Sequence, residues 1–303
     1  MRLAKKILSV LIVASALFVF TEDANAQQDA MYTQYMDNLL VINPAFAGSK
    51  EIGNLLMVSR TQWVSFDGAP KTFSFSYNTA LKENNIGLGF SVLNDIIGPQ
   101  KQTGVYFDYS HFFQVSEKFR LGMGLKVGVS FYRAALTELD PINPDPIFSN
   151  DIYENFLPNL GIGFYLFSDD TYFGLSVPKL IRNTINRDDY LTEHVQRQEI
   201  HIYFVAGKQF SLSENVQLKT NTMLRYVQIA PVTWDVTAMF GFKEQFWVGG
   251  MFRLGDSYGI LAQFYVKEKI RIGYSYDITY SVLNTFNNGT HEIMFGYNFD
   301  IFR

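Results

Sequence analysis

The sequence predicts an all-β fold, a transmembrane antiparallel β-barrel of about fourteen strands of the outer-membrane type. First, apolar residues alternate with small, polar or charged residues over most of the chain from Gly53 to Phe302, and a strand sends successive side chains to opposite faces. Second, no stretch after Phe20 approaches the about 18 uninterrupted apolar residues of a membrane-spanning helix. Third, the connections between the expected strands are alternately short and long, which is typical of outer-membrane barrels.

The first 26 residues have the layout of a secretory signal peptide. A basic start precedes an apolar run over residues 7–20, which is short for a membrane span. Small residues up to Ala26 then offer a cleavage point, so we expect residues 1–26 to be removed. An uncleaved N-terminal anchor is the alternative. The chain contains no Cys, which excludes a lipoprotein anchor, disulfides and thiolate metal sites.

Residues 27–50 show no strand alternation, yet they are too apolar for a disordered tail. The Asn43-Pro44 pair favours a turn, and Gly48 tolerates a positive φ. We therefore expect this segment to be packed, either inside the barrel as a plug or against the periplasmic rim, and residues 51–303 to form the barrel.

The strand pattern is clearest in residues 121–131, where every odd position is apolar and every even position is Gly, Lys or Ser. We expect the apolar rows to face lipid and the small and charged rows to face the lumen; the alternative is a soluble lipocalin-like or sandwich protein with its apolar rows inside. Most segments have lengths near the roughly 9–11 residues that a tilted membrane strand needs. The predicted strands are residues 53–62, 71–80, 86–94, 102–113, 118–133, 156–167, 171–177, 197–210, 215–227, 232–242, 246–254, 258–267, 270–279 and 291–302.

Charged residues interrupt the rows expected to face the lumen. We interpret them as structural groups that pair across the lumen. They are Arg120, Lys126, Lys219, Arg225, Arg253, Arg271, Asp235 and Asp277.

The connections predict the orientation of the barrel. The long connections, above all residues 134–155 and 178–196, follow odd-numbered strands, whereas short polar turns follow even-numbered strands. Outer-membrane barrels place their short turns in the periplasm. An even strand number then places both termini in the periplasm.

No residue pattern indicates an enzyme. Ser110 and His111 are adjacent on a strand and face opposite sides, and we interpret Asp188, Asp189 and His194 as part of a solvated loop. We therefore expect no catalytic residues, no cofactor and no metal. The acidic loop 134–155 carries carboxylates that suit calcium, but its spacing fits no EF-hand, and protein contact is the better interpretation. A net charge of −4 without a basic stripe argues against nucleic acid as a partner.

Four short motifs add a resemblance. Residues 29–38 read DAMYTQYMDN, residues 43–49 read NPAFAGS, residues 60–63 read RTQW and residues 68–72 read GAPKT. In these motifs, and in length and strand rhythm over the whole mature chain, the sequence resembles the PorP/SprF family of type IX secretion system membrane proteins.

The resemblance implies a non-enzymatic outer-membrane component of the type IX secretion and gliding-motility machinery. Its implied partners are periplasmic secretion components or a lipoprotein, a secreted substrate such as an adhesin domain, and the lipid bilayer. The alternative function is an outer-membrane channel for hydrophobic compounds of the fatty-acid-transporter type. The partner-binding residues that the motifs suggest are Tyr32, Gln34, Tyr35, Asn43, Pro44, Phe46, Gly48, Arg60, Gln62 and Trp63.

Overall fold

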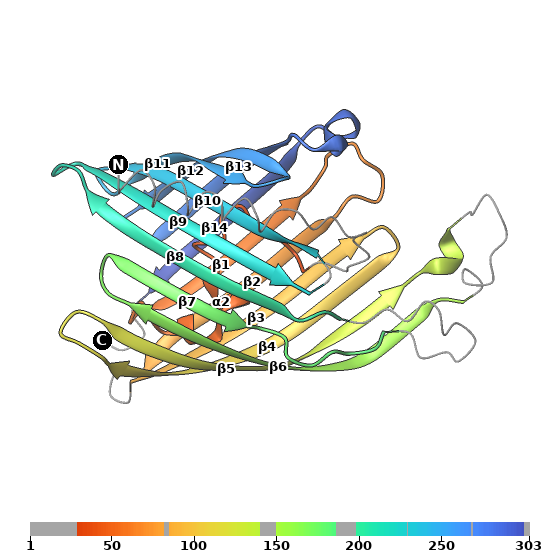
Figure 1. Cartoon of the computed structure of the whole chain (residues 1–303), viewed down its shortest axis with the longest axis horizontal. Coiled ribbons are helices and arrows are strands. Elements are labelled where there is room, and N and C mark those ends of the chain that lie inside the picture. Colours follow the sequence, from red (N-terminus) through yellow and green to blue (C-terminus); the bar gives the residue numbers. More distant parts are fainter. Residues whose placement is uncertain are drawn as a thin grey trace, which may run out of the picture.

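Fourteen antiparallel strands close into a barrel, in which each strand pairs with its neighbours in the chain and β14 pairs with β1 (Figure 1). The predicted fold class is confirmed. The computed structural model describes residues 29–81, 85–139, 150–185, 198–228, 230–267 and 269–299. The strands are β1 (Gly53–Thr61), β2 (Lys71–Leu81), β3 (Ile86–Ile97), β4 (Gln100–Gln114), β5 (Arg120–Ala134), β6 (Ile152–Phe167), β7 (Thr171–Val177), β8 (His201–Ser211), β9 (Val216–Val227), β10 (Ala230–Phe242), β11 (Phe246–Arg253), β12 (Ser257–Val266), β13 (Ile270–Thr279) and β14 (Thr290–Phe299).

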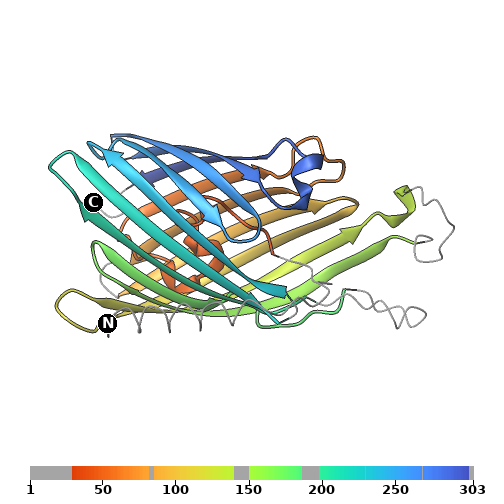
Figure 2. The ribbon, with the colours of Figure 1, turned by 45° about the horizontal axis from the view of Figure 1, so that its top comes forward.

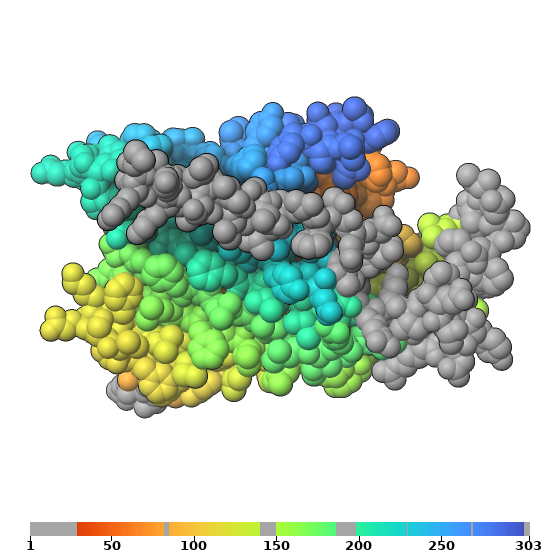
Figure 3. Space-filling model, viewed as in Figure 1, coloured from red at the N-terminus to blue at the C-terminus, as the bar shows by residue number. Residues whose placement is uncertain are grey.

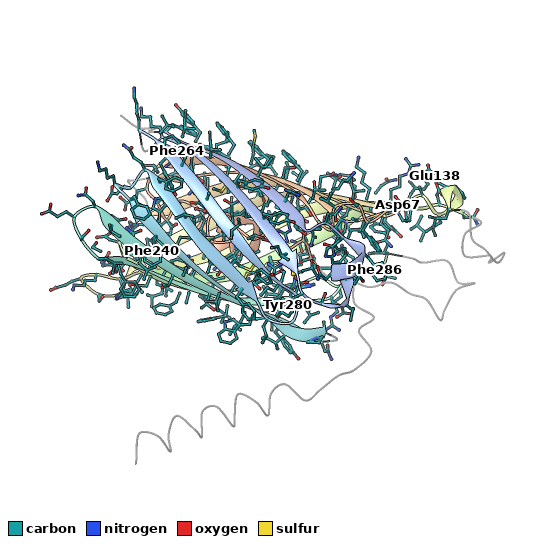
Figure 4. All side chains as sticks on the ribbon, turned by 90° about the horizontal axis from the view of Figure 1, so that it is seen from above. Asp67, Glu138, Phe240, Phe264, Tyr280 and Phe286 are labelled. Carbon is teal, nitrogen blue, oxygen red and sulfur yellow. The ribbon has the colours of Figure 1, made fainter. Side chains whose placement is uncertain are left out.

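The apolar rows face outward, as predicted. In β5, Leu125 and Val127 are about half exposed, whereas Gly124 and Lys126, which alternate with them, are buried. Phe240 and Phe264 likewise project from the outer wall (Figure 4). The space-filling view shows the outer side of β5 to β8 as a continuous wall of side chains (Figure 3). Such an apolar outer wall suits hydrocarbon, and closure leaves no strand edge to satisfy there.

The strands next to the longest connections depart most from the predicted bounds. β6 begins at Ile152, four residues earlier than predicted, and pairs with the far end of β5 through a shift of register between Ser130 and Tyr132. β8 begins at His201, four residues later than predicted. β5 and β6 therefore extend past the other strands at one end of the barrel (Figure 1).

Short turns and long connections occupy opposite rims of the barrel. The turns after β4, β6 and β8 lie at one end, which we call the short-turn rim, and the connections after β1, β5 and β13 lie at the other, the long-connection rim (Figures 1 and 2). β1 begins and β14 ends at the short-turn rim.

Residues 29–50, here called the inner segment, lie within the ring of strands (Figure 2). They contain a short helix, α2 (Leu39–Ile42), and a single 3₁₀ turn, η1 (Pro44–Phe46). Asp29 lies beside Lys179, which follows β7 at the long-connection rim, whereas Gly48 lies against Gly87 near the short-turn rim.

The described chain therefore begins at the long-connection rim and ends, at Phe299, at the short-turn rim. The two termini themselves lie outside the described residues, so the expectation that both lie in the periplasm stays a prediction. That expectation followed from strand number alone, and it omitted the length of chain that crosses the lumen before β1. The predicted signal peptide, residues 1–26, lies outside the described residues. No helix of the described residues is long and apolar enough to cross a membrane.

Substituting Arg for Val127, at the middle of the outer face of β5, tests the lipid-facing wall. A cation at the bilayer midplane costs about 2–4 kcal/mol on a barrel's lipid face, so we expect V127R to lower the free energy of unfolding in lipid vesicles by that amount. V115R is the control, because Val115 lies in the exposed β4–β5 turn. Equal stabilities of the two variants would contradict a lipid-facing wall.

Candidate functional site

The inner segment is held by polar groups that reach it from all sides of the barrel. A cluster of three charged side chains binds the first turn of the inner segment. The three are Arg60 of β1, Asp277 of β13 and Glu292 of β14, and each is at most 2% exposed. The Nη1 atom of Arg60 lies 2.9 Å from Asp277 and 3.2 Å from Glu292. The Arg60 guanidinium therefore lies between the two carboxylates and offsets their mutual repulsion.

The same cluster binds backbone and side-chain donors of the inner segment. The backbone N–H groups of Thr33 and Gln34 donate to the two carboxylate oxygens of Glu292, at 2.9 and 2.8 Å. The Thr33 hydroxyl donates to Asp277 (2.5 Å) and accepts from Arg60 (2.6 Å). Charge-assisted hydrogen bonds are roughly twice as strong as neutral ones, so this cluster fixes the backbone at residues 33–34.

Two further buried ion pairs each direct one donor at a carbonyl of the inner segment. Arg253 pairs with Asp235 (2.7 Å) and donates to the carbonyl of Tyr32 (3.3 Å). Lys126 pairs with Asp108 (2.7 Å) and donates to the carbonyl of Leu40 (3.2 Å). Within each pair the two charges neutralise each other, and the basic partner also stabilises the inner segment by a hydrogen bond.

The pairs join neighbouring strands, which corrects the expectation that charges pair across the lumen. Asp235 lies opposite Arg253 in the β10–β11 register, and Asp108 lies opposite Lys126 in the β4–β5 register. Directly opposed residues have Cβ atoms only about 4.5–5.5 Å apart. The far wall is out of reach, because the inner segment lies between.

Asp29 anchors the start of the inner segment at the long-connection rim. Its carboxylate lies 2.6 Å from Lys179 Nζ and 3.6 Å from His201 Nδ1, and its carbonyl accepts from Arg225 (3.2 Å). Burial alone would raise the pKa of Asp29, but Lys179, His201 and Arg225 together hold it well below its usual range. The anchor therefore stays ionised at any physiological pH.

The turn at residues 43–48 fits against a glycine surface of the wall. Asn43 caps η1 by accepting from the N–H of Ala45 (3.0 Å) and donates to the Phe164 carbonyl (3.0 Å). A Cβ atom on Gly163 would lie 2.1 Å from the Asn43 Oδ1 atom, and one on Gly124 would lie 2.2 Å from the Ala45 nitrogen. Only glycine permits this close approach, which explains why the lumen-facing row of these strands is so small.

The structure places nine of the ten predicted partner-binding residues inside the barrel. All nine are buried, and their contacts are with other parts of this chain. Trp63, at the long-connection rim, is the exception and is partly exposed. The buried residues are Tyr32, Gln34, Tyr35, Asn43, Pro44, Phe46, Gly48, Arg60 and Gln62.

The motifs therefore describe how the inner segment and the wall fit together, and a role of these residues in binding a partner stays a prediction. Sequence reasoning missed two acids that hold the inner segment. They are Glu292 of the wall and Asp37 of the segment itself, which pairs with Arg271 of β13 (2.6 Å). The signal for Glu292 was present, because it is a charge in a lumen-facing row. For Asp37 there was no signal, because residues 27–50 lack a period that assigns faces.

The long-connection rim carries an ordered, exposed apolar surface. The β1–β2 connection and the β13–β14 connection are joined by backbone hydrogen bonds, from Val64 N–H to the Gly289 carbonyl (2.9 Å) and from Asn288 N–H to the Val64 carbonyl (2.8 Å). The second connection contains the 3₁₀ helix η6 (Val282–Phe286). We call the two connections together the rim platform.

The rim platform exposes large apolar side chains. Val282 is 88% exposed, Phe286 63% and Phe66 43%. Phe286 lies at the end of the barrel that also carries Asp67 and Glu138 (Figure 4). Exposed apolar groups on an ordered surface indicate a contact face for protein or membrane.

No metal or hydrolase centre is found in the part of the chain that the structure describes. There, no three His, Asp or Glu side chains are placed to hold a metal ion. Most of the acidic loop considered for calcium, residues 140–149, and the loop with Asp188, Asp189 and His194 lie outside the described residues. Ser110 donates to the Ala47 carbonyl inside the barrel, while His111 packs beside Phe113.

The comparison with family models identifies the chain. The model of the type IX secretion system membrane protein PorP/SprF matches residues 24–297. The chain belongs to the PorP/SprF family. As a member, it is an outer-membrane component of type IX secretion that interacts with the secretion machinery. A search among curated proteins found no match.

Solved structures similar to this PorP/SprF barrel are outer-membrane barrels. The CymD monoaromatic hydrocarbon channel is 11% identical with a TM-score of 0.51, over 90% of this chain and 94% of that one. Omp33 of Acinetobacter baumannii is 8% identical (TM-score 0.45; 83% and 98% covered), and a Pseudomonas aeruginosa FadL homologue is 10% identical (TM-score 0.45; 82% and 89% covered). At these identities the likeness concerns the fold alone.

Replacing Arg60 by Met should loosen the inner segment of this PorP/SprF barrel. Removing the cation leaves Asp277 and Glu292 buried without it, and breaking a buried ion pair costs about 3–5 kcal/mol. We expect a lower unfolding temperature and faster proteolysis within residues 29–50. R133M is the control, because Arg133 is half exposed and its carboxylate partners lie 3.9 Å away. Unchanged protection of the inner segment in R60M would contradict the clamp.

Replacing Asn43 by Ala removes the cap of η1 and leaves the Phe164 carbonyl without its donor. Loss of a cap costs about 1 kcal/mol. We expect faster amide hydrogen exchange at residues 43–48 with strand protection unchanged, measured by mass spectrometry. N284A, at an exposed position of η6, should leave both regions unchanged; slower or equal exchange in N43A would contradict the role of Asn43.

Proposed function

We propose that this PorP/SprF protein is a non-enzymatic docking component that holds secreted surface proteins, such as adhesins, at the long-connection rim. The observation that carries the proposal is that the lumen is occupied by the chain's own inner segment, which buried ion pairs fix from several strands. A barrel whose interior is filled in this way acts through its rims.

The orientation follows from the two rims. Short turns of outer-membrane barrels face the periplasm and longer loops face the outside. We therefore propose that the rim platform faces the cell exterior and that the short-turn rim faces the periplasmic secretion components or a lipoprotein. β1 then begins and β14 ends on the periplasmic side, while Asp29 lies near the outer side.

The rim platform is the docking face that this orientation favours. It joins two connections that are far apart in the sequence, so it is held in one shape without a partner. Rigid apolar groups lose little entropy on binding. Val282 and Phe286 supply such groups at the long-connection rim.

A channel for hydrophobic compounds is the alternative function. A cavity beside the inner segment supports it, because its lining includes Val41, Ile42, Leu93 and Tyr203. Lys126 and Lys179, which also line that cavity, weigh against a route for apolar molecules. Uptake of a labelled fatty acid by cells that carry or lack the gene separates the two functions.

The double substitution of Asp for Val282 and Phe286 tests docking. We expect normal amounts of folded barrel in the outer membrane, seen as heat-modifiable electrophoretic mobility, together with release of type IX cargo into the medium. The reason is that binding of cargo would bury two new carboxylates, and the free-energy cost of removing them from water weakens the binding. L212D is the control, because Leu212 is exposed at the opposite rim. Full surface retention of cargo in the double variant would refute docking at the rim platform.

A further inference from the structure

Three cations gather in the lumen at the short-turn rim, around the end of the inner segment. Lys50 ends the inner segment, Lys219 lies on the inner face of β9, and Arg271 lies on the inner face of β13. All three act electrostatically on one acid, Asp37 of the inner segment. We call Lys50, Lys219 and Arg271 the cation cluster.

The cation cluster is not neutralised. Asp37 is bonded to Arg271 Nη1 (2.6 Å) and to Gln263 Nε2 (2.6 Å). Over the described ranges, no carboxylate oxygen lies within 4.0 Å of Lys50 or Lys219, and the Nε and Nη2 atoms of the buried Arg271 have no hydrogen-bond partner. Asp37 and the three described cations together therefore carry a net positive charge.

Two further acids among the described residues lie near the cation cluster. Glu51 pairs with Arg120, and Glu244 accepts from Gln217 Nε2 (2.6 Å). Arg120 neutralises Glu51, whereas Glu244 keeps its charge beside a neutral amide and attracts Lys219. The described groups of the cluster still carry one excess positive charge.

Aromatic rings position the two lysines without neutralising them. Lys219 Nζ lies 3.7 Å from the centre of the Trp247 ring, and Lys50 Nζ lies 5.8 Å from the centre of the Phe46 ring. A cation over a ring face is attracted to it, yet it keeps its charge and its free N–H donors. The lysines are thus held in place with donors available.

The lysines are also open to water. Lys50 is exposed and Lys219 is half-buried, although the barrel wall surrounds both. Arg271 and Lys219 repel the Lys50 ammonium, whereas Asp37 attracts it. A bound anion would relieve this repulsion.

We propose that the cation cluster binds the carboxylate side chains of an acidic peptide segment that a periplasmic partner inserts into the short-turn mouth of the barrel. The proposal deepens the proposed function and rests on its orientation. A peptide fits better than a lipid headgroup, because the site opens inside the wall, whereas lipid contacts the outer face. Lys50 and Lys219 would donate to the carboxylates, and Arg271 would supply further positive potential.

The test is binding of fluorescein-labelled hexaglutamate to the purified full-length protein in detergent, followed by fluorescence anisotropy at low salt. A hydrogen bond to a charged group is worth about one tenfold step in affinity. We expect the K50Q/K219Q double variant to bind at least about tenfold more weakly, and K50R/K219R to retain the affinity of the original protein. High salt should weaken binding of the original protein.

K118Q is the matched control, because it removes one positive charge from the exposed β4–β5 turn at the same rim. We expect its affinity to change less than about twofold. Heat-modifiable mobility shows that each variant is folded.

Equal binding by K50Q/K219Q and the original protein would overturn the site. Displacement of the peptide by inorganic phosphate or by lipid A vesicles at equal charge concentration would overturn the assignment to a peptide. Neither result depends on cargo retention, so failure of this site and failure of the docking proposal are distinguishable.

Discussion

The structure depends on buried ion pairs that join strands one or two positions apart in the wall and that hydrogen-bond to the inner segment. Arg60, with Asp277 and Glu292, is the central example. Buried charges are costly unless they are paired and hydrogen-bonded. Arg60, Asp277 and Glu292 pair with one another in the wall, and each also exchanges a hydrogen bond with the inner segment. Removing the inner segment would leave these charges without those hydrogen bonds in the interior.

Glycine supplies the complementary constraint. Where the charged rows hold the start of the inner segment, the small rows leave space for its end, as the approaches of Asn43 to Gly163 and of Ala45 to Gly124 show. Charged and glycine residues placed in this way on the lumen wall fix the path of the inner segment's backbone through the lumen. We therefore propose that the rims, and not the interior, contact other molecules. An apolar platform lies at one rim, and a cation cluster with a net positive charge lies at the other.

Several features of the fold were accessible to sequence reasoning because their period is local. The alternation in residues 121–131 assigns Leu125 to the outer face and Lys126 to the inner face without any tertiary information. The alternation of short and long connections indicates which connections share a rim. The limits of β6 and β8 were not accessible, because a register shift opposite Ser130 and long connections set them. The same reasoning marked Asp235 and Arg253 as lumen charges but expected pairing across the lumen and named no partners, since register between strands is a tertiary property.

By itself, the sequence determined the barrel, its outer and inner rows and the unusual character of residues 27–50, because strand alternation and apolar content are properties of the local chain. Only the tertiary structure decided that the inner segment runs from one rim to the other, so that Asp29 and Phe299 lie at opposite ends. It also decided that Tyr35, Asn43 and Arg60 face other parts of this chain. The physical reason is that an aperiodic segment carries no face of its own: its surroundings are set by charges such as Lys126 and Glu292, far away in sequence, which meet it only when the barrel closes.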